Sequence, residues 1–152
     1  MEGSIENLVE GMRITLGTAF SLYTSTHCAH WNVEGSDFFE LHKMLELQYE
    51  DIWDSLDAIA EHLRTLDAYT PMSMSRLIEL SRADELPPAP IGARELLIHL
   101  MRGNEAMIAI LNETLHIATD ADEQGLINFL AGRIEAHQKH RWMLRASAKP
   151  QK

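Results

Sequence analysis

Apolar residues recur at intervals of three and four along most of the chain, which is the spacing of a helix face that packs into a core. The pattern predicts four long helices, over about residues 4–31, 37–63, 93–115 and 120–146. In the first of them the apolar positions are Ile5, Leu8, Val9, Met12, Leu16, Ala19, Phe20 and Tyr23. No stretch alternates between apolar and polar residues as a strand does, so the chain is expected to be all-α.

Prolines separate the predicted helices into two pairs. Their positions are Pro71, Pro87, Pro88, Pro90 and Pro150. Residues 66–91 hold four of the prolines and are expected to form a long crossover, within which the periodic segment 74–81 predicts about two turns of helix. One long and two short connections between long helices are typical of a four-helix bundle with a single crossover.

Two capping patterns indicate where helices start. Asp37 is followed three residues later by Glu40, and Asp120 is followed in the same way by Glu123. The second and fourth long helices are therefore expected to begin at Asp37 and Asp120. Asp122 lies in the same acidic segment, where negative charge favours the positive end of a helix dipole.

Length and composition limit the classes of function. With 152 residues, 45% of them hydrophobic, the chain is expected to form one domain over residues 1–152 with a short basic tail at 147–152. Its net charge of −10 disfavours nucleic acids and anionic membranes as partners. A lone cysteine, Cys28, no signal-peptide pattern and no apolar stretch near the ~20 residues of a membrane span predict a cytoplasmic protein.

The second predicted helix carries two polar pairs within its apolar pattern. His42 and Glu46 are four residues apart, as are Asp57 and Glu61, so each pair shares a helix face. The two pairs point to broadly the same side but lie roughly 22 Å apart along the helix axis, too far to bind one metal ion. Antiparallel pairing of this helix with a second copy, crossing near residues 49–53, would bring one pair beside the other.

His30 ends the first predicted helix, and it lies across a short turn from His42. Imidazole and carboxylate groups together suit iron, manganese or zinc, and few protein ligands leave positions open for water, dioxygen or peroxide. A solvated polar helix face is the alternative interpretation of each pair taken alone. The five residues together, set among apolar ones, favour a metal site.

A series of residues in this region forms one pattern: His30, Trp31, Asn32, Val33, Gly35, Phe38, Leu41, His42, Glu46, Asp57, Ala60 and Glu61. The pattern resembles the Dps mini-ferritins, the DNA-protection-during-starvation proteins. This resemblance implies a ferritin-like four-helix bundle with a short extra helix in the crossover, assembled into a homododecamer. It also implies ferroxidase centres at dimer interfaces, with His30 and His42 from one subunit, Asp57 and Glu61 from its partner, and Glu46 completing the site.

The reaction implied by the resemblance is oxidation of Fe(II) to Fe(III) by hydrogen peroxide or dioxygen, with the ferric mineral stored inside a hollow shell. Such storage protects against oxidative damage, and zinc and manganese would compete for the same ligands. Trp31 is expected to act as a radical sink beside His30, or else to be a core aromatic. The resemblance also assigns Asp120, Asp122 and Glu123 to pores through which Fe(II) enters.

Other features are expected to be structural. Glu113 and His116 match half of the di-iron motif of larger ferritins and are expected on the surface. His137 and His140 are expected in packing or surface roles, and His27 as a histidine bonded to a backbone carbonyl. An alternative is a shell protein that has the ligands but performs no turnover.

Iron storage without DNA binding is the expectation, and the alternative is DNA binding by several copies of a basic C-terminal end. The last 20 residues contain Arg133, Lys139, Arg141, Arg145, Lys149 and Lys152. Most of these charges fall on a predicted helix, and only Lys149 and Lys152 are expected to be mobile. The N-terminal segment 2–10 has three glutamates and no lysine.

Overall fold

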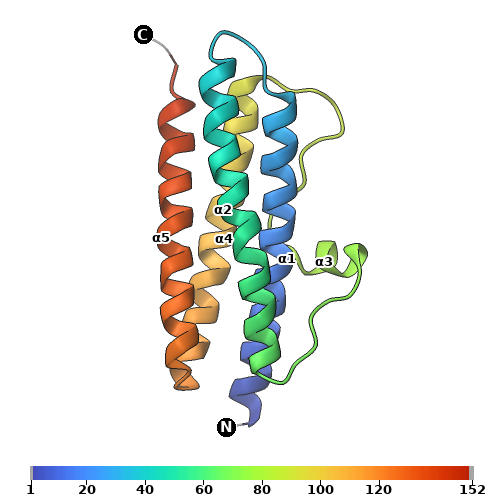
Figure 1. Cartoon of the computed structure of the whole chain (residues 1–152), viewed down its shortest axis with the longest axis vertical. Helices are drawn as coiled ribbons and strands as arrows, with labels where there is room; N and C mark the ends of the chain where they lie inside the picture. The colour runs from blue at the N-terminus through green and yellow to red at the C-terminus, as the bar shows by residue number, and fades with distance from the viewer. Residues whose placement is uncertain (1, 151–152) are drawn as a thin grey trace.

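The computed structural model describes residues 2–150, and helices account for most of that range (Figure 1). Their bounds are α1, Glu2–Asn32; α2, Phe38–Thr65; α3, Met74–Leu80; α4, Ala93–Asp120; and α5, Gln124–Ser147. No strand occurs among these residues, which confirms the all-α bundle with a short extra helix in its crossover. None of the helices in the described range is long and apolar enough to span a membrane.

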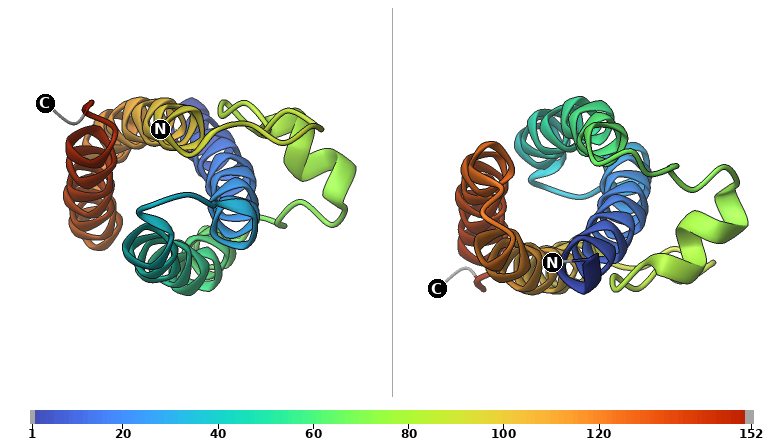
Figure 2. Two further views of the ribbon diagram at one scale, coloured as in Figure 1. Left: turned by 90° about the horizontal axis from the view of Figure 1, so that it is seen from above. Right: turned by 90° about the horizontal axis from the view of Figure 1, so that it is seen from below.

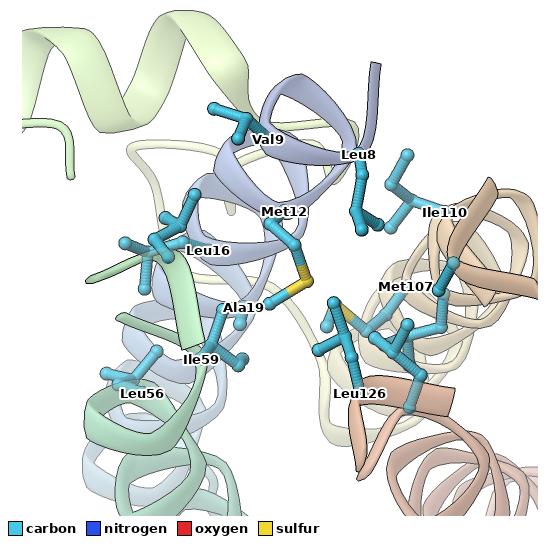
Figure 3. Close-up of a cluster of buried hydrophobic side chains, with 14 of the residues drawn as sticks. Leu8, Val9, Met12, Leu16, Ala19, Leu56, Ile59, Met107, Ile110 and Leu126 are labelled. Carbon is cyan, nitrogen blue, oxygen red and sulfur yellow. The ribbon is translucent and has the colours of Figure 1, made fainter. Parts of the chain in front are cut away.

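The four long helices pack as two antiparallel pairs. Helix α1 lies beside α2 and α4 lies beside α5, and the pairs are joined where α1 packs against α4 (Figure 2). Figure 3 shows the core between them, where Leu8 and Met12 of α1 meet Ile59 of α2 and Met107 of α4. Each of the four long helices contributes apolar residues to this core.

Helix α3 lies outside the bundle and packs on α1 (Figure 2). Gly17 of α1 allows this close approach, because a Cβ atom at that position would lie 2.6 Å from the backbone oxygen of Leu77 and 2.8 Å from Cβ of Leu80. Glycine is unfavourable inside a helix, but here it is needed where the crossover helix contacts α1.

The predicted start of the fourth long helix at Asp120 is wrong. Asp120 is the last residue of α4, and α5 begins at Gln124. Asp122 has φ of 56°, and the amide of Glu123 donates to the carbonyl of Ala118 at 3.0 Å, so the segment closes α4 in the way of a left-handed helix cap. The acidic residues that suggested a capping box thus belong to a tight turn.

Asp37 does precede α2, but its side chain makes no capping hydrogen bond. The C-terminal end also differs from expectation, because α5 runs to Ser147 and Ala148 is buried. The carbonyl of Ala148 accepts a hydrogen bond of 2.9 Å from Nε of Arg94. The mobile tail can therefore start no earlier than Lys149, and Lys152 lies outside the described residues.

Candidate metal-binding site

His30 and His42 face each other across the turn between α1 and α2. Nδ1 of His30 lies 2.8 Å from the backbone oxygen of His42, and Nδ1 of His42 lies 2.8 Å from the backbone oxygen of His30. Their rings stack with centroids 3.7 Å apart. Because a carbonyl oxygen only accepts, each Nδ1 carries the proton and donates it, which leaves Nε2 of each ring with a lone pair suited to a metal.

The turn that joins the two helices creates this arrangement. The amide of Val33 donates to the carbonyl of Ala29 at 2.9 Å and ends α1, and the Val33 side chain is buried. Gly35 then has φ of 117°, a conformation that side chains rarely allow, and α2 starts at Phe38. The reversal places a histidine near the end of α1 opposite one near the start of α2.

Glu46 lies one helical turn beyond His42 and is half-buried. Its Oε2 is 2.8 Å from Nζ of Lys43. This hydrogen bond and the positive charge of Lys43 lower the pKa of Glu46. Glu46 is therefore a carboxylate at neutral pH, able to accept a metal ion if Lys43 releases it.

Asp57 and Glu61 are exposed on the far half of α2, and the structure does not bring them to the histidines. Neither side chain forms a hydrogen bond or ion pair with the described part of the chain. No three His, Cys, Asp or Glu side chains among these residues gather closely enough to hold a metal ion. One chain thus carries two separate candidate half-sites, one at the α1–α2 turn and one on the far half of α2. That they combine between two subunits stays a prediction.

The histidines adjoin an aromatic cluster that the sequence analysis missed, formed by Tyr23, His27, Tyr49 and Trp53. The Tyr23 hydroxyl lies 3.0 Å from Nδ1 of His27, and the His27 ring stacks on Tyr49 at 3.8 Å. The expected bond from His27 to a backbone carbonyl is therefore replaced by one to a phenol. Burial is the main cause that lowers the pKa of His27, and a smaller electrostatic contribution from His30 acts in the same direction. The four-residue spacing of Tyr23 and His27 was the available signal.

The cluster lines a cavity of about 400 Å³ whose rim adds Glu50 and Asp54. Trp53 is 54% exposed at this surface of α2. Trp31, next to His30, is 63% exposed, and its ring lies 4.2 Å from that of His27. It is therefore a surface aromatic and not a core one.

A second polar cluster lies inside the bundle between α2, α4 and α5. Arg133 binds Asp51 through two hydrogen bonds of 2.9 and 3.1 Å, and Nε2 of His140 lies 3.3 Å from the same carboxylate. Nδ1 of His137 lies 2.9 Å from the side-chain oxygen of Asn104. His137 and His140 are both buried, so their role is internal packing, and the Asp51–Arg133 pair, 82 residues apart, had no local sequence signal.

Burial dominates the electrostatics of this cluster. It lowers the pKa of His140 to about 4, against an opposing contribution from Asp51, and it lowers the pKa of His137 well below the usual value. Both rings are therefore neutral at pH 7. Nearby, the amide of Gln48 is buried with neither its nitrogen nor its oxygen bonded to another described group.

The remaining predicted residues lie on the surface of the chain. Asp120 and Asp122 are exposed at the α4–α5 turn, and Glu123 is half-buried there. A single chain forms no pore, so their assignment to an iron entrance stays a prediction. Glu113 and His116 are exposed on α4, as expected for surface residues.

Known proteins resemble this chain along most of its length. The model of the ferritin-like domain matches residues 12–149. The chain is 34% identical to a low-temperature-induced protein of Nostoc sp. over 86% of this chain and 74% of that one. It is 30% identical to DNA protection during starvation protein 2 of Bacillus anthracis, over 82% of this chain and 85% of the relative.

A solved structure shares the fold closely. The DPS protein of Vibrio cholerae, described as a member of a broad superfamily of ferritin-like diiron-carboxylate proteins, superimposes with a TM-score of 0.90 at 26% identity. The alignment covers 97% of this chain and 92% of that one. The chain therefore belongs to the Dps family of ferritin-like proteins.

Proposed function

We propose that this protein detoxifies and stores iron by oxidising Fe(II) to Fe(III) at sites shared between two subunits. Its substrates are Fe(II) and hydrogen peroxide, with dioxygen as a second oxidant, and the ferric mineral collects inside a cytoplasmic homododecamer. The observation that carries the proposal is the tautomer of His30 and His42, whose backbone hydrogen bonds present two Nε2 lone pairs at one end of α2. Zinc and manganese are expected to compete there.

The positions on α2 support a shared site. Residues 42 and 61 lie equally far from the midpoint between residues 51 and 52, and so do residues 46 and 57. An antiparallel second copy that crosses at this midpoint would place the histidine half-site of one subunit beside Asp57 and Glu61 of the other. Trp53 lies on the same helical stripe near the midpoint and is exposed, and aromatic residues are enriched at protein interfaces.

Each residue has a defined contribution in this proposal. The Nε2 atoms of His30 and His42 hold Fe(II), and the carboxylates of Glu46, Asp57 and Glu61 add the hard oxygen ligands that favour Fe(III). Lys43 must release Glu46 when the metal ion arrives, since both compete for the same oxygen. Trp31, exposed beside His30, is the proposed sink for stray oxidising equivalents.

The family resemblance also suggests where Fe(II) enters. Asp120, Asp122 and Glu123 are proposed to line the pore by which Fe(II) enters, because a ring of carboxylates attracts cations. DNA is not proposed as a partner. Arg133, one of the basic residues near the C-terminus, is neutralised by Asp51 inside the bundle, which leaves less charge for phosphate contacts.

Subunit mixing tests the shared site. His42→Ala and Asp57→Ala proteins, each inactive alone, are dissociated, mixed and reassembled, then loaded anaerobically with Fe(II) and given stoichiometric hydrogen peroxide. Each mixed dimer contains one intact site, so the ferric absorbance should recover to at most about half of the wild-type value.

The matched control mixes His42→Ala with His30→Ala. Both changes affect the same half-site, so every site in a mixed dimer keeps one defect and activity should not return. Recovery in the control, or no recovery in the first mixture despite confirmed mixed assembly, would refute the shared site. Wild-type oxidation no faster than in buffer would refute iron oxidation as the function and favour a purely structural shell.

A further inference from the structure

Tyr23 is hydrogen-bonded to a base next to the candidate iron ligands. Its hydroxyl lies 3.0 Å from Nδ1 of His27, one helical turn further along α1. This distance is within the range over which a proton can pass directly between two side chains. With the ring proton on Nε2, the phenol donates to Nδ1, which is then ready to accept the proton fully.

The pair is also close to the iron half-site. The His27 ring centroid lies 5.9 Å from that of His30 and 5.6 Å from that of Tyr23. Packed rings therefore form a short path from the ligand His30 to the phenol. All three side chains come from α1, so the path does not depend on a loop.

The other aromatic residues of this region lack such a base. The Tyr49 hydroxyl, the indole of Trp31 and the indole of Trp53 form no hydrogen bond with a histidine or carboxylate in the described chain. A phenol that loses an electron becomes a strong acid and must release its proton. A neighbouring base therefore makes one tyrosine easier to oxidise than an otherwise similar one.

We propose that Tyr23 is a reversible one-electron donor for the iron reaction, with His27 as the acceptor of its proton. This inference rests on the proposed function of the adjacent iron site. Tyr23 does not contact the metal ion in this proposal. It differs from an irreversible radical sink because its proton stays within the Tyr23–His27 pair and can return. The probe of that role is the tyrosyl radical itself.

The steps balance in electrons and atoms. One Fe(II) reduces hydrogen peroxide and yields Fe(III), hydroxide and a hydroxyl-radical equivalent. Tyr23 gives that equivalent one electron to form a second hydroxide, while the phenolic proton moves to Nδ1 of His27. A second Fe(II) then reduces the tyrosyl radical, and the proton returns to the phenol. In total, two Fe(II) ions and one peroxide give two Fe(III) ions and two hydroxides, with no radical released.

The chain offers a matched test because it contains only three tyrosines. Tyr69 is 73% exposed and is removed from both test proteins as Tyr69→Phe. Tyr69→Phe/Tyr49→Phe then retains only Tyr23, and Tyr69→Phe/Tyr23→Phe retains only Tyr49. Circular dichroism and size-exclusion mass verify that the two proteins fold and assemble alike.

The first measurement uses iron-free protein. A flash-generated ruthenium(III) tris-bipyridine oxidant is applied, the sample is frozen at once, and ring-deuterated tyrosine identifies any tyrosyl radical by electron paramagnetic resonance. We expect the radical in the protein that retains Tyr23 and its loss in the one that retains Tyr49. An equal or stronger signal from Tyr49, or none from Tyr23, would overturn the proposal.

The second measurement adds Fe(II) and hydrogen peroxide, with a spin trap for hydroxyl radical. The protein that lacks Tyr23 should release several-fold more trapped radical than the one that lacks Tyr49, and equal release would overturn the proposed role. If neither protein oxidises Fe(II), the proposed function fails, whereas the iron-free signal still decides whether Tyr23 and His27 form a redox pair.

Discussion

Acid should weaken the attachment of α5 to α2, because His140 is buried against Asp51 and Arg133 at their contact. Burial lowers the pKa of His140 from 6.5 to about 4. As the pH falls below 6.5, the unfolded chain binds a proton at this position while the folded chain does not. The resulting stability is fully present above pH 6.5 and is lost as the pH falls towards 4.

The size of this effect follows from the two pKa values. At about 1.4 kcal/mol for each pKa unit, the fall from 6.5 to about 4 sets a ceiling of about 3 kcal/mol for His140. Between pH 7 and pH 4.5 the expected loss is about 2 kcal/mol, since protonation of the unfolded chain is then nearly complete. The lowered pKa of His137 adds a loss in the same direction.

The test is urea unfolding of iron-free wild type and His140→Gln at a fixed subunit concentration, from pH 7 to pH 4.5. Glutamine can still donate to Asp51 but does not titrate in this range. The variant should lose about 2 kcal/mol less than the wild type on acidification. His116→Gln, a change at an exposed histidine of α4, is the control and should keep the wild-type pH dependence.

Equal pH dependence in wild type and His140→Gln would refute this reasoning, because the acid sensitivity would then arise elsewhere. A stronger acid loss in the variant would refute it as well. Size-exclusion mass at each pH separates dissociation of subunits from unfolding of the chain, so that a change in assembly is not read as a change in stability.

The remaining predictions concern two glycines and the C-terminal end of the chain. Gly17→Ala should destabilise the protein by about 1–3 kcal/mol, because the added Cβ would overlap Leu80 and the backbone of α3. Gly132→Ala has open space around it and should stabilise α5 by up to about 1 kcal/mol. Thermal unfolding measures both. Deletion from Lys149 onward should leave the rate of Fe(II) oxidation and the Tm unchanged. Deletion from Ala148 should cost about 1 kcal/mol through its lost backbone hydrogen bond, without slowing oxidation, and a slower rate would mean that the end of α5 supports the site.

The helices and the crossover could be predicted from the sequence, because apolar periodicity and proline positions are local signals. The end of α4 could not be predicted in this way. The pattern of Asp120 and Glu123 suits a helix start as well as a tight turn, and only the left-handed conformation of Asp122 distinguishes the two. Such a conformation depends on how α4 and α5 pack and not on the acidic residues alone.

Part of the candidate site could also be predicted from the sequence. The meeting of His30 and His42 follows from a short turn between two helices, and the structure places the rings in contact. Metal binding by them, and the contribution of Asp57 and Glu61, stay predictions because they need a second subunit. The Asp51–Arg133 pair was missed because no short-range spacing links residues on two distant helices.

The hydrogen bonds of His30 and His42 end on main-chain oxygens and not on side chains. Replacing either histidine removes one imidazole but leaves the carbonyl that orients the other. The surviving ring should therefore keep its proton on Nδ1 and its metal-facing nitrogen free. Loss of one histidine should therefore leave the orientation of the other unchanged, and a single reverse substitution should restore the half-site.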